Sequence, residues 1–404
     1  MPCVICGSSD LAFLVELASV PVVCNQLHRN REAARRVARG DIWLVGCRCC
    51  GHVFNAAFDA TRVVYDERYE NSLMGSQHYR RYSEDIVSRL LSTYGLAGGA
   101  AVEIGCGRGE FLRMLCKRGL RKGIGFDPGR PTGEDTVDDP AVTIIGDVFT
   151  PSLAPYADIV CSRYVLEHLP RPVDLLRSIR EAYASHPARV VYTEVPNGTY
   201  MLDRLGIWDP LYEHLSYFTS SSLAHAVRLA GLAPGPINIG FGHQFLAVEA
   251  TFAEPEADER AMAPPDTQSF DGFADRFRKA LSVWQDWLNQ ARWEGRRLVL
   301  WGAGAKGVTF LNILDRSGRA VEQVVDVNPL KAGAFTAGTG HLIVPPAALK
   351  ERPPDKILVM NPEYETEIRQ TLAGLGLDVE LVVVSGRLPP LATYERRSIS
   401  CVSS

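Results

Sequence analysis

The chain has 404 residues, with 43 basic and 47 acidic side chains and a net charge of -4. This length predicts two or three domains, each large enough for a core of its own. The basic residues are scattered, which argues against nucleic acid as the main partner. No apolar run approaches the roughly 20 residues that span a bilayer, and no signal pattern opens the chain, so we expect a cytoplasmic protein without a membrane partner.

Two Cys-x2-Cys-Gly patterns occur near the N-terminus, at residues 3–7 and 47–51. In a chain of ten cysteines without a secretory signal, such pairs indicate metal ligands in preference to disulfides. The glycine after each pair relaxes the turn so that both sulfurs can face one tetrahedral ion, and four thiolates favour a structural zinc. Cys49 could replace a neighbour, and unmetallated buried cysteines are the alternative. The predicted zinc ligands are Cys3, Cys6, Cys47 and Cys50.

A basic, polar insertion at residues 29–39 separates the two cysteine pairs, and a tyrosine-rich segment follows residue 60. The apolar and aromatic residues of this segment fall at helical spacing from residue 79 and predict a helix through residue 91. We expect most of its tyrosines to pack or to form a lid. They are Tyr65, Tyr69, Tyr79 and Tyr82.

Residues 102–112 read as a buried strand, a tight turn and the first turn of an apolar helix. Gly105, Gly107 and Gly109 permit positive φ angles and a close approach of the backbone to a ligand. Glu103, at the end of the strand, can accept hydrogen bonds from a ligand amine or hydroxyl. The dinucleotide spacing Gly-x-Gly-x-x-Gly fits poorly here. The pattern resembles the cofactor loop of class I methyltransferases that use S-adenosylmethionine (SAM).

Three further predicted strands strengthen this resemblance. The second strand ends at Asp127, roughly 20 residues after the glycine loop, where a carboxylate suits a ribose diol. The third ends at Asp147, and in the family the acid at this place contacts the adenine edge. The fourth, at residues 158–162, leads into the segment 165–169. The alternative is a doubly wound α/β sheet whose glycine turn binds no ligand.

The rest of this domain shows alternating helix and strand patterns and ends in a predicted antiparallel hairpin, as class I methyltransferases do. A proline-rich linker without apolar periodicity follows. The next helix carries one apolar stripe, which we interpret as core or interdomain packing. The predicted elements are helices at 172–184 and 220–229, strands at 190–195, 237–240 and 244–251, the linker at 253–269, and the stripe Phe270, Phe273, Phe277, Leu281, Trp284 and Leu288.

A second α/β unit begins with a strand at residues 298–301 and a Gly-x-Gly-x-x-Gly turn at 302–307. Asp326 ends the next strand at the distance expected of a ribose-binding acid, so the motif alone predicts a nucleotide site. Alternatively the turn is only fold geometry, or its helix N-terminus with Lys306 holds a diphosphate. Strands at 357–360 and 381–384, with a helix at 363–375, complete the unit, and the tail is expected to be loosely held.

The order of a zinc module, a SAM core and a second Rossmann-like unit resembles the nucleotide-sugar C-methyltransferases that place branching methyl groups on deoxysugars in antibiotic biosynthesis. The most specific features are the cysteine pairs, the Glu-His-Leu-Ser-Tyr-Phe motif at 213–218 and the second glycine turn. In that family the last unit binds no nicotinamide and helps to close over the nucleotide sugar. The predicted domains are 1–60 for zinc, 61–252 for SAM, the linker 253–269, 270–390 for substrate, and the tail 391–404.

Carbon methylation needs a base, because a C–H bond must become an enolate before it can attack the sulfonium methyl group. A 4-keto sugar acidifies the neighbouring carbon, and a histidine that titrates near neutrality can take the proton. By resemblance, His214 is this base, and Glu213 orients it or holds the substrate. His168 also matches a family histidine near the sugar. The alternative is that Glu213 and His214 are only an exposed turn before a helix.

The sequence departs from the family at positions that face the substrate. Leu211 stands where the family has a tyrosine, and Tyr164 stands where it has an asparagine, whereas the cofactor and zinc positions are intact. A non-sugar acceptor is therefore a second hypothesis, and an NAD-binding or sensor protein is a third. The sequence leaves the oligomeric state open. The predicted substrate-binding residues are Tyr69, Tyr164, Tyr212, Gly304 and Lys306.

Overall fold

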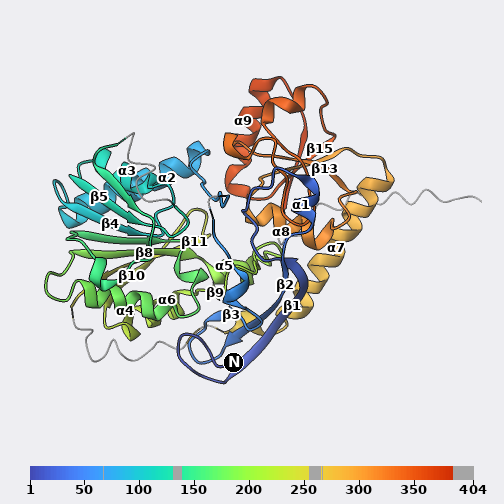
Figure 1. Ribbon diagram of the computed structural model, residues 1–404. Coiled ribbons are helices and arrows are strands. Elements are labelled where there is room, and N and C mark those ends of the chain that lie inside the picture. The colour runs from blue at the N-terminus through green and yellow to red at the C-terminus, as the bar shows by residue number, and fades with distance from the viewer. Residues whose placement is uncertain (67, 131–138, 254–264, 266, 385–404) are drawn as a thin grey trace, which may run out of the picture.

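The computed structural model describes residues 1–66, 68–130, 139–253, 265 and 267–384. Most of the predicted linker and the whole predicted tail, residues 391–404, lie outside the described residues. Three sheets organise the rest of the chain: one of seven strands, one of five strands and an N-terminal sheet of four. In Figure 1 the seven-stranded sheet is on the left, the C-terminal domain is at the upper right, and the N-terminal strands run below and beside the C-terminal domain. No helix in these ranges is both long and apolar enough to cross a membrane.

The seven-stranded sheet has the order β10-β11-β8-β7-β4-β5-β6. Every neighbouring pair is parallel except those of β11, which runs antiparallel to β8 and β10 and forms the predicted terminal hairpin. The strands are β4 (Ala100–Ile104), β5 (Lys122–Phe126), β6 (Val142–Ile145), β7 (Ile159–Arg163), β8 (Val190–Pro196), β10 (Ala233–Gly240) and β11 (Phe245–Thr251).

Helices cover both faces of this sheet because its central strands are buried on both sides. Leu90 of α2 and Leu112 of α3 pack on one face, and Leu176 of α4 and Ala226 of α6 pack on the other. Figure 1 shows these two layers above and below the sheet. The helices are α2 (Gln77–Tyr94), α3 (Glu110–Lys117), α4 (Pro172–Ala182), α5 (Gly198–Arg204) and α6 (Ser220–Leu229).

The C-terminal domain is built on a fully parallel sheet in the order β14-β13-β12-β15-β16. It confirms the second α/β unit that the sequence predicts. Its strands are β12 (Leu298–Trp301), β13 (Val321–Val325), β14 (Ile343–Val344), β15 (Lys356–Val359) and β16 (Glu380–Val383), and its helices are α7 (Phe273–Trp293), α8 (Ala305–Leu314) and α9 (Glu365–Leu375). Short 3-10 helices lie at η1 (Ala60–Arg62), η2 (Pro151–Leu153), η3 (Leu166–His168), η5 (Gln268–Phe270), η6 (Pro329–Lys331), η7 (Pro346–Lys350) and η8 (Pro362–Tyr364).

The N-terminal sheet is antiparallel and draws its last strand from the seven-stranded domain. It contains β1 (Leu11–Pro21), β2 (Arg39–Cys47), β3 (Val53–Asn55) and β9 (Ser216–Tyr217), and helix α1 (Arg31–Arg35) lies between β1 and β2. Val53 of β3 pairs with Tyr217 of β9. The N-terminal sheet therefore holds the chain segment that directly follows Glu213 and His214.

Helix α7 joins the N-terminal sheet to the C-terminal domain through the predicted apolar stripe. Phe277 and Trp284 are almost fully buried in one cluster with Leu14 of β1, Ile42 of β2 and residues of α8 and β12. The interpretation of the stripe as packing is confirmed. The first and last parts of the chain share a core, and the domain boundaries themselves stay predictions.

The basic insertion at residues 29–39 contacts the C-terminal domain through its arginine side chains. Arg29 donates hydrogen bonds to the carbonyls of Leu330 and Ala332, and Arg31 and Arg35 donate to the carbonyls of Gly340 and Thr339. These guanidinium groups satisfy backbone acceptors in a loop region of the C-terminal domain. The insertion that separates the cysteine pairs is thus a docking segment for a part of the C-terminal domain that lies 301 to 309 residues further along the chain.

Candidate active site

A cavity of about 560 Å³ opens between the seven-stranded domain and the C-terminal domain. Both glycine turns line it, with Gly105 and Gly107 on one side and Gly304 and Lys306 on the other. Each turn follows the carboxyl end of a parallel strand, which is where open α/β sheets bind ligands. The tertiary structure therefore brings the two predicted sites into one cavity.

The first glycine turn has the backbone conformation that its spacing predicts. The φ angles of Gly105, Gly107 and Gly109 are +68°, +55° and +70°. A Cβ atom at Gly105 would lie 2.2 Å from Cγ2 of Val165, so a larger residue cannot stand there without displacing that neighbour. Asp127 accepts a hydrogen bond of 2.8 Å from the N–H of Gly107 and holds the turn open toward the cavity.

The acids predicted to contact the cofactor occupy different environments. Glu103 lines the cavity, is only 3% exposed, and leaves Oε2 without a hydrogen-bond partner. Burial raises the pKa of Glu103 to about 8, although the nearby Arg163 guanidinium opposes this shift. An orphaned buried carboxyl oxygen fits a cationic or hydroxyl group of a ligand. Asp147 is exposed, accepts from the N–H of Val148 and is not among the described residues that line the cavity, so its adenine contact stays a prediction.

Two histidines meet in the cavity wall. The rings of His168 and His214 cross almost at right angles, with centroids 4.8 Å apart. Burial lowers the pKa of His168 to about 4, and burial together with His168 lowers the pKa of His214 well below its usual value. Both imidazoles are therefore neutral at pH 7. The structure brings together the two histidines that the sequence placed in the site.

Family comparisons agree with this geometry. The model described as a methyltransferase domain matches residues 75–234, and the model described as the C-methyltransferase C-terminal domain matches residues 243–382. The chain is a SAM-dependent methyltransferase. The expected class I α/β fold and the enzymatic activity are thereby confirmed, and the C-terminal match supports carbon as the methylated atom.

Solved structures similar to the methyltransferase include the magnesium protoporphyrin IX methyltransferase of Synechocystis with bound S-adenosylhomocysteine. It is 16% identical, with a TM-score of 0.35, and the match covers 44% of this chain and 84% of that one. A SAM-dependent methyltransferase of Mesorhizobium loti is also 16% identical, with a TM-score of 0.34 and coverage of 42% and 97%. No curated protein matches the chain.

Glu213 lies behind the cavity wall of the methyltransferase, and it is not among the described residues that line the cavity. Its side chain accepts hydrogen bonds from the N–H of Cys24 at 2.9 Å and from the hydroxyl of Tyr69 at 3.1 Å. Its backbone carbonyl lies 3.0 Å from Nδ1 of His168. Burial raises the pKa of Glu213 to about 7. Glu213 therefore positions Tyr69 and His168, and no hydrogen bond between its carboxyl group and His214 is found.

The predicted substrate residues divide into two groups. Tyr69 and Tyr164 line the cavity, and Tyr164 has a φ angle of +57°, which is strained for a residue with a side chain. Tyr212 is different: it is 1% exposed, packs against Gly40 and accepts a hydrogen bond from the N–H of Asp59. Its side chain lies in the core below the cavity, so the structure gives no support for a substrate contact by Tyr212.

The second glycine turn carries a cation that faces both domains. Nζ of Lys306 lies 3.0 Å from Oδ1 of Asp209 and donates to Oε1 of Gln244, also at 3.0 Å. Gln244 in turn exchanges hydrogen bonds with the side chain of Asn361. Asp326 accepts from the N–H groups of Ala303 and Asn328, so both its carboxyl oxygens are engaged. These contacts close the cavity from the C-terminal side.

Sequence reasoning missed a buried ion pair in the cavity wall. Nε of Arg163 lies 2.7 Å from Oε2 of Glu194, and the guanidinium also donates to the hydroxyl of Tyr79. Tyr79 in turn donates to the hydroxyl of Tyr164. The only available signal was a charged residue at the end of each of two buried strands, and the sequence alone does not show that these strands are neighbours.

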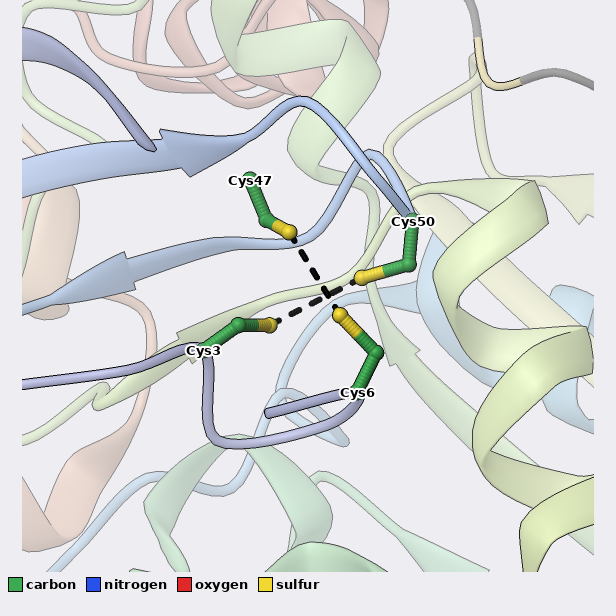
Figure 2. A group of neighbouring side chains, drawn as sticks. All are labelled: Cys3, Cys6, Cys47 and Cys50. Atoms are coloured by element: carbon green, nitrogen blue, oxygen red, sulfur yellow. Dashed lines mark hydrogen bonds between the residues drawn. The ribbon is translucent and has the colours of Figure 1, made fainter. Parts of the chain in front are cut away.

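The four predicted zinc ligands form one cluster (Figure 2). Sγ of Cys3 lies 3.7 Å from that of Cys50, and Sγ of Cys6 lies 3.5 Å from that of Cys47. A tetrahedral zinc with bonds of about 2.3 Å needs sulfurs roughly 3.8 Å apart, so the cluster fits this ion. Cys49 is exposed and lies outside the cluster among the described residues.

Proposed function

We propose that this enzyme transfers a methyl group from SAM to a carbon of a nucleotide-linked keto-deoxysugar. One observation carries the proposal: neutral His168 and His214 lie in a cavity that both glycine turns line. A site of this kind can hold a methyl donor on one side, an acceptor on the other and a base between them. The C-terminal family match supports the same class of reaction.

The first glycine turn fits SAM. Gly105 and Gly107 let the backbone approach the ligand, Asp127 stands where a ribose diol would lie, and Glu103 offers an unpaired oxygen to the ammonium group. When bound, SAM supplies a methyl group on a sulfonium, which an enolate carbon can attack. The chain has to orient the acceptor carbon and remove its proton.

His214 is our proposed base. A ketone acidifies the adjacent C–H bond; as that bond breaks, its electron pair stays on the carbon of the enolate and the proton moves to an imidazole nitrogen of His214. The nitrogen must be unprotonated beforehand, which the lowered pKa of His214 ensures. His168 and Tyr69 line the same wall and can accept hydrogen bonds from hydroxyl groups of the sugar.

The second glycine turn suits the diphosphate of a nucleotide sugar. Lys306, which also pairs with Asp209, and the N-terminus of α8 bring positive charge to the cavity opposite the SAM turn. NAD binding at this turn stays a hypothesis: both carboxyl oxygens of Asp326 accept backbone hydrogen bonds, as those of Asp127 do at the first turn, and a calorimetric titration with NAD tests it. We further propose a structural zinc at the four-cysteine cluster.

A second candidate is carbon methylation of a non-sugar acceptor. Leu211 and Tyr164 line the cavity where the resembled family has polar groups, and the ring of Phe245 lies 5.0 Å from that of Tyr164. This apolar and aromatic wall favours a less polar acceptor than a sugar. Product mass after incubation with SAM and a panel of thymidine-diphosphate keto-sugars separates the two, because only the first predicts a sugar nucleotide heavier by one methylene unit.

The base assignment has its own test. We expect His214→Gln to lower kcat for methyl transfer by roughly 10²- to 10⁴-fold, because the carbon acid then lacks its base. The affinity for SAM, measured by calorimetry, should stay within about twofold, because His214 lies outside the glycine turn. A His214→Gln enzyme with full kcat would rule out His214 as the base.

A further inference from the structure

A second acid lies beside the two histidines, and the reaction described above gives it no task. Glu167 belongs to η3, directly after β7, so it enters the cavity wall together with His168. It is 1% exposed, and Oε2 has no hydrogen-bond partner among the described residues. Ligand atoms of Glu167, His168 and His214 all lie within 4.8 Å of one another.

The base needs a charge partner because the cavity wall partly shields its ring from water. When an imidazole that is shielded from water accepts a proton, the resulting cation is poorly solvated. For this reason burial makes His214 a weak base. A neighbouring carboxylate would make the protonated state electrically neutral as a pair. Such a pair is a stronger base than the imidazole alone.

The other acids and hydroxyls around His214 already have partners. The carboxyl group of Glu213 accepts from Cys24 and Tyr69. The hydroxyl of Tyr217 exchanges hydrogen bonds with the backbone of Leu211.

Glu194, on strand β8, raises the pKa of Glu167 by charge repulsion, and it forms an ion pair with Arg163. The hydroxyl of Tyr65 lies 2.7 Å from Nδ1 of His168. Nδ1 of His168 also faces the backbone carbonyl of Glu213, which can only accept a hydrogen bond, so we assign the ring proton to Nδ1. His168 therefore cannot take up a further proton through this nitrogen. In the cluster with His168 and His214, Glu167 keeps a carboxyl oxygen without a partner among the described residues.

We propose that Glu167 is the positioning residue that pairs with His214 and compensates its charge when the imidazole accepts the proton of the acceptor carbon. This inference rests on the proposed function. The reactive state has a neutral His214 beside an ionised Glu167. Proton transfer breaks the C–H bond, leaves its electron pair on the enolate carbon, and converts the pair into an imidazolium and a carboxylate with no net charge.

The pH dependence follows from this pairing. Burial raises the pKa of Glu167 to about 8, so the pair holds a proton at low pH and loses it as pH rises. We expect kcat of the wild-type enzyme to increase with pH through neutrality. In Glu167→Gln the lone imidazole is already unprotonated throughout this range but is a weaker base, so kcat should be roughly 10- to 100-fold lower and nearly independent of pH.

Two measurements test the inference on full-length protein. The first is kcat against pH for wild type, Glu167→Gln, Glu167→Asp and Glu213→Gln. Glu167→Asp should keep part of the pH-dependent increase, and Glu213→Gln should move the increase to lower pH, because the charge of Glu213 contributes to the raised pKa of Glu167. An unchanged pH profile in Glu167→Gln would overturn the inference.

The second measurement needs no acceptor. Nitrogen NMR of labelled histidines, assigned with His214→Phe, should show a change in the chemical shift of the His214 ring near pH 8 in wild type, where Glu167 loses its proton, and no such change in Glu167→Gln. If this difference appears but no keto-sugar is methylated, the proposed substrate fails and the pairing stands. If sugars are methylated and wild type shows no change near pH 8, the pairing fails. A metal ion bound by wild type at this cluster and lost from Glu167→Gln would also overturn it.

Discussion

At the scale of single residues, the site is a set of buried acids whose environments differ. Glu103 and Glu167 each keep one carboxyl oxygen unpaired and have a pKa raised to about 8, whereas Glu213 has two hydrogen-bond donors at its carboxyl group. The glycine spacing predicted a role for Glu103, and a family motif predicted one for Glu213. Nothing in the sequence distinguished Glu167, because which acid is left unpaired depends on the direction of each side chain.

The unpaired oxygen of Glu103 makes SAM binding depend on pH. Below pH 8 this carboxyl group is mostly protonated, and binding a cation beside it must expel the proton, so affinity should rise up to about tenfold per pH unit between pH 6 and 8. Glu103→Gln should weaken binding and remove this dependence. Calorimetry in buffers of different ionisation heat measures both the affinity and the proton released.

Asp147→Asn is the matched control for Glu103→Gln, because the side chain of Asp147 is exposed. We expect it to change the affinity for SAM less than Glu103→Gln does, and without altering its pH dependence. A larger loss in Asp147→Asn would restore the adenine contact that the sequence predicts and would count against Glu103 as the cation partner.

At the scale of elements, short segments place the reactive groups. The 3-10 helix η3 brings Glu167 and His168 into the cavity wall, and β9 ties the segment after His214 to the N-terminal sheet. That sheet ends at the cysteine cluster, since Cys47 is the last residue of β2. The cysteine cluster therefore supports, through this sheet, the chain segment that carries His214.

Loss of one cysteine ligand should destabilise this support. We expect Cys50→Ser to lower the Tm by roughly 10 °C, because a structural zinc contributes several kcal/mol to folding. Cys49→Ser should leave the Tm almost unchanged, because Cys49 is exposed and outside the cluster. Calorimetric scans and zinc content by mass spectrometry check both variants; equal Tm values would contradict a structural metal at Cys50.

At the scale of the whole molecule, one core connects the N-terminal sheet to the C-terminal domain. Residues of β1, β2, α7, α8 and β12 belong to the same buried cluster, and the arginines of the 29–39 insertion dock on the C-terminal domain. The seven-stranded domain faces this combined unit across the cavity. The N-terminal sheet and the C-terminal domain should consequently unfold together.

Trp284 tests this cooperativity. It is 1% exposed within the shared core, so Trp284→Ala should cost about 3 to 5 kcal/mol of unfolding free energy. Trp293, on the same helix, is 87% exposed, and Trp293→Ala should cost less than about 0.5 kcal/mol. Denaturant unfolding monitored by hydrogen exchange should show both regions losing protection together in Trp284→Ala; loss confined to the C-terminal domain would contradict a common core.

The local features of this protein were readable from its sequence because they depend on neighbouring residues. Glycine spacing predicted the turn at Gly105, the alternation of strand and helix predicted both α/β units, and paired cysteines predicted the sulfur cluster. Long-range relations depend on how the chain packs. Packing alone decided that both glycine turns share one cavity, that Tyr212 turns into the core, that Arg163 meets Glu194, and that Glu167 keeps a carboxyl oxygen without a partner while Glu213 accepts two hydrogen bonds.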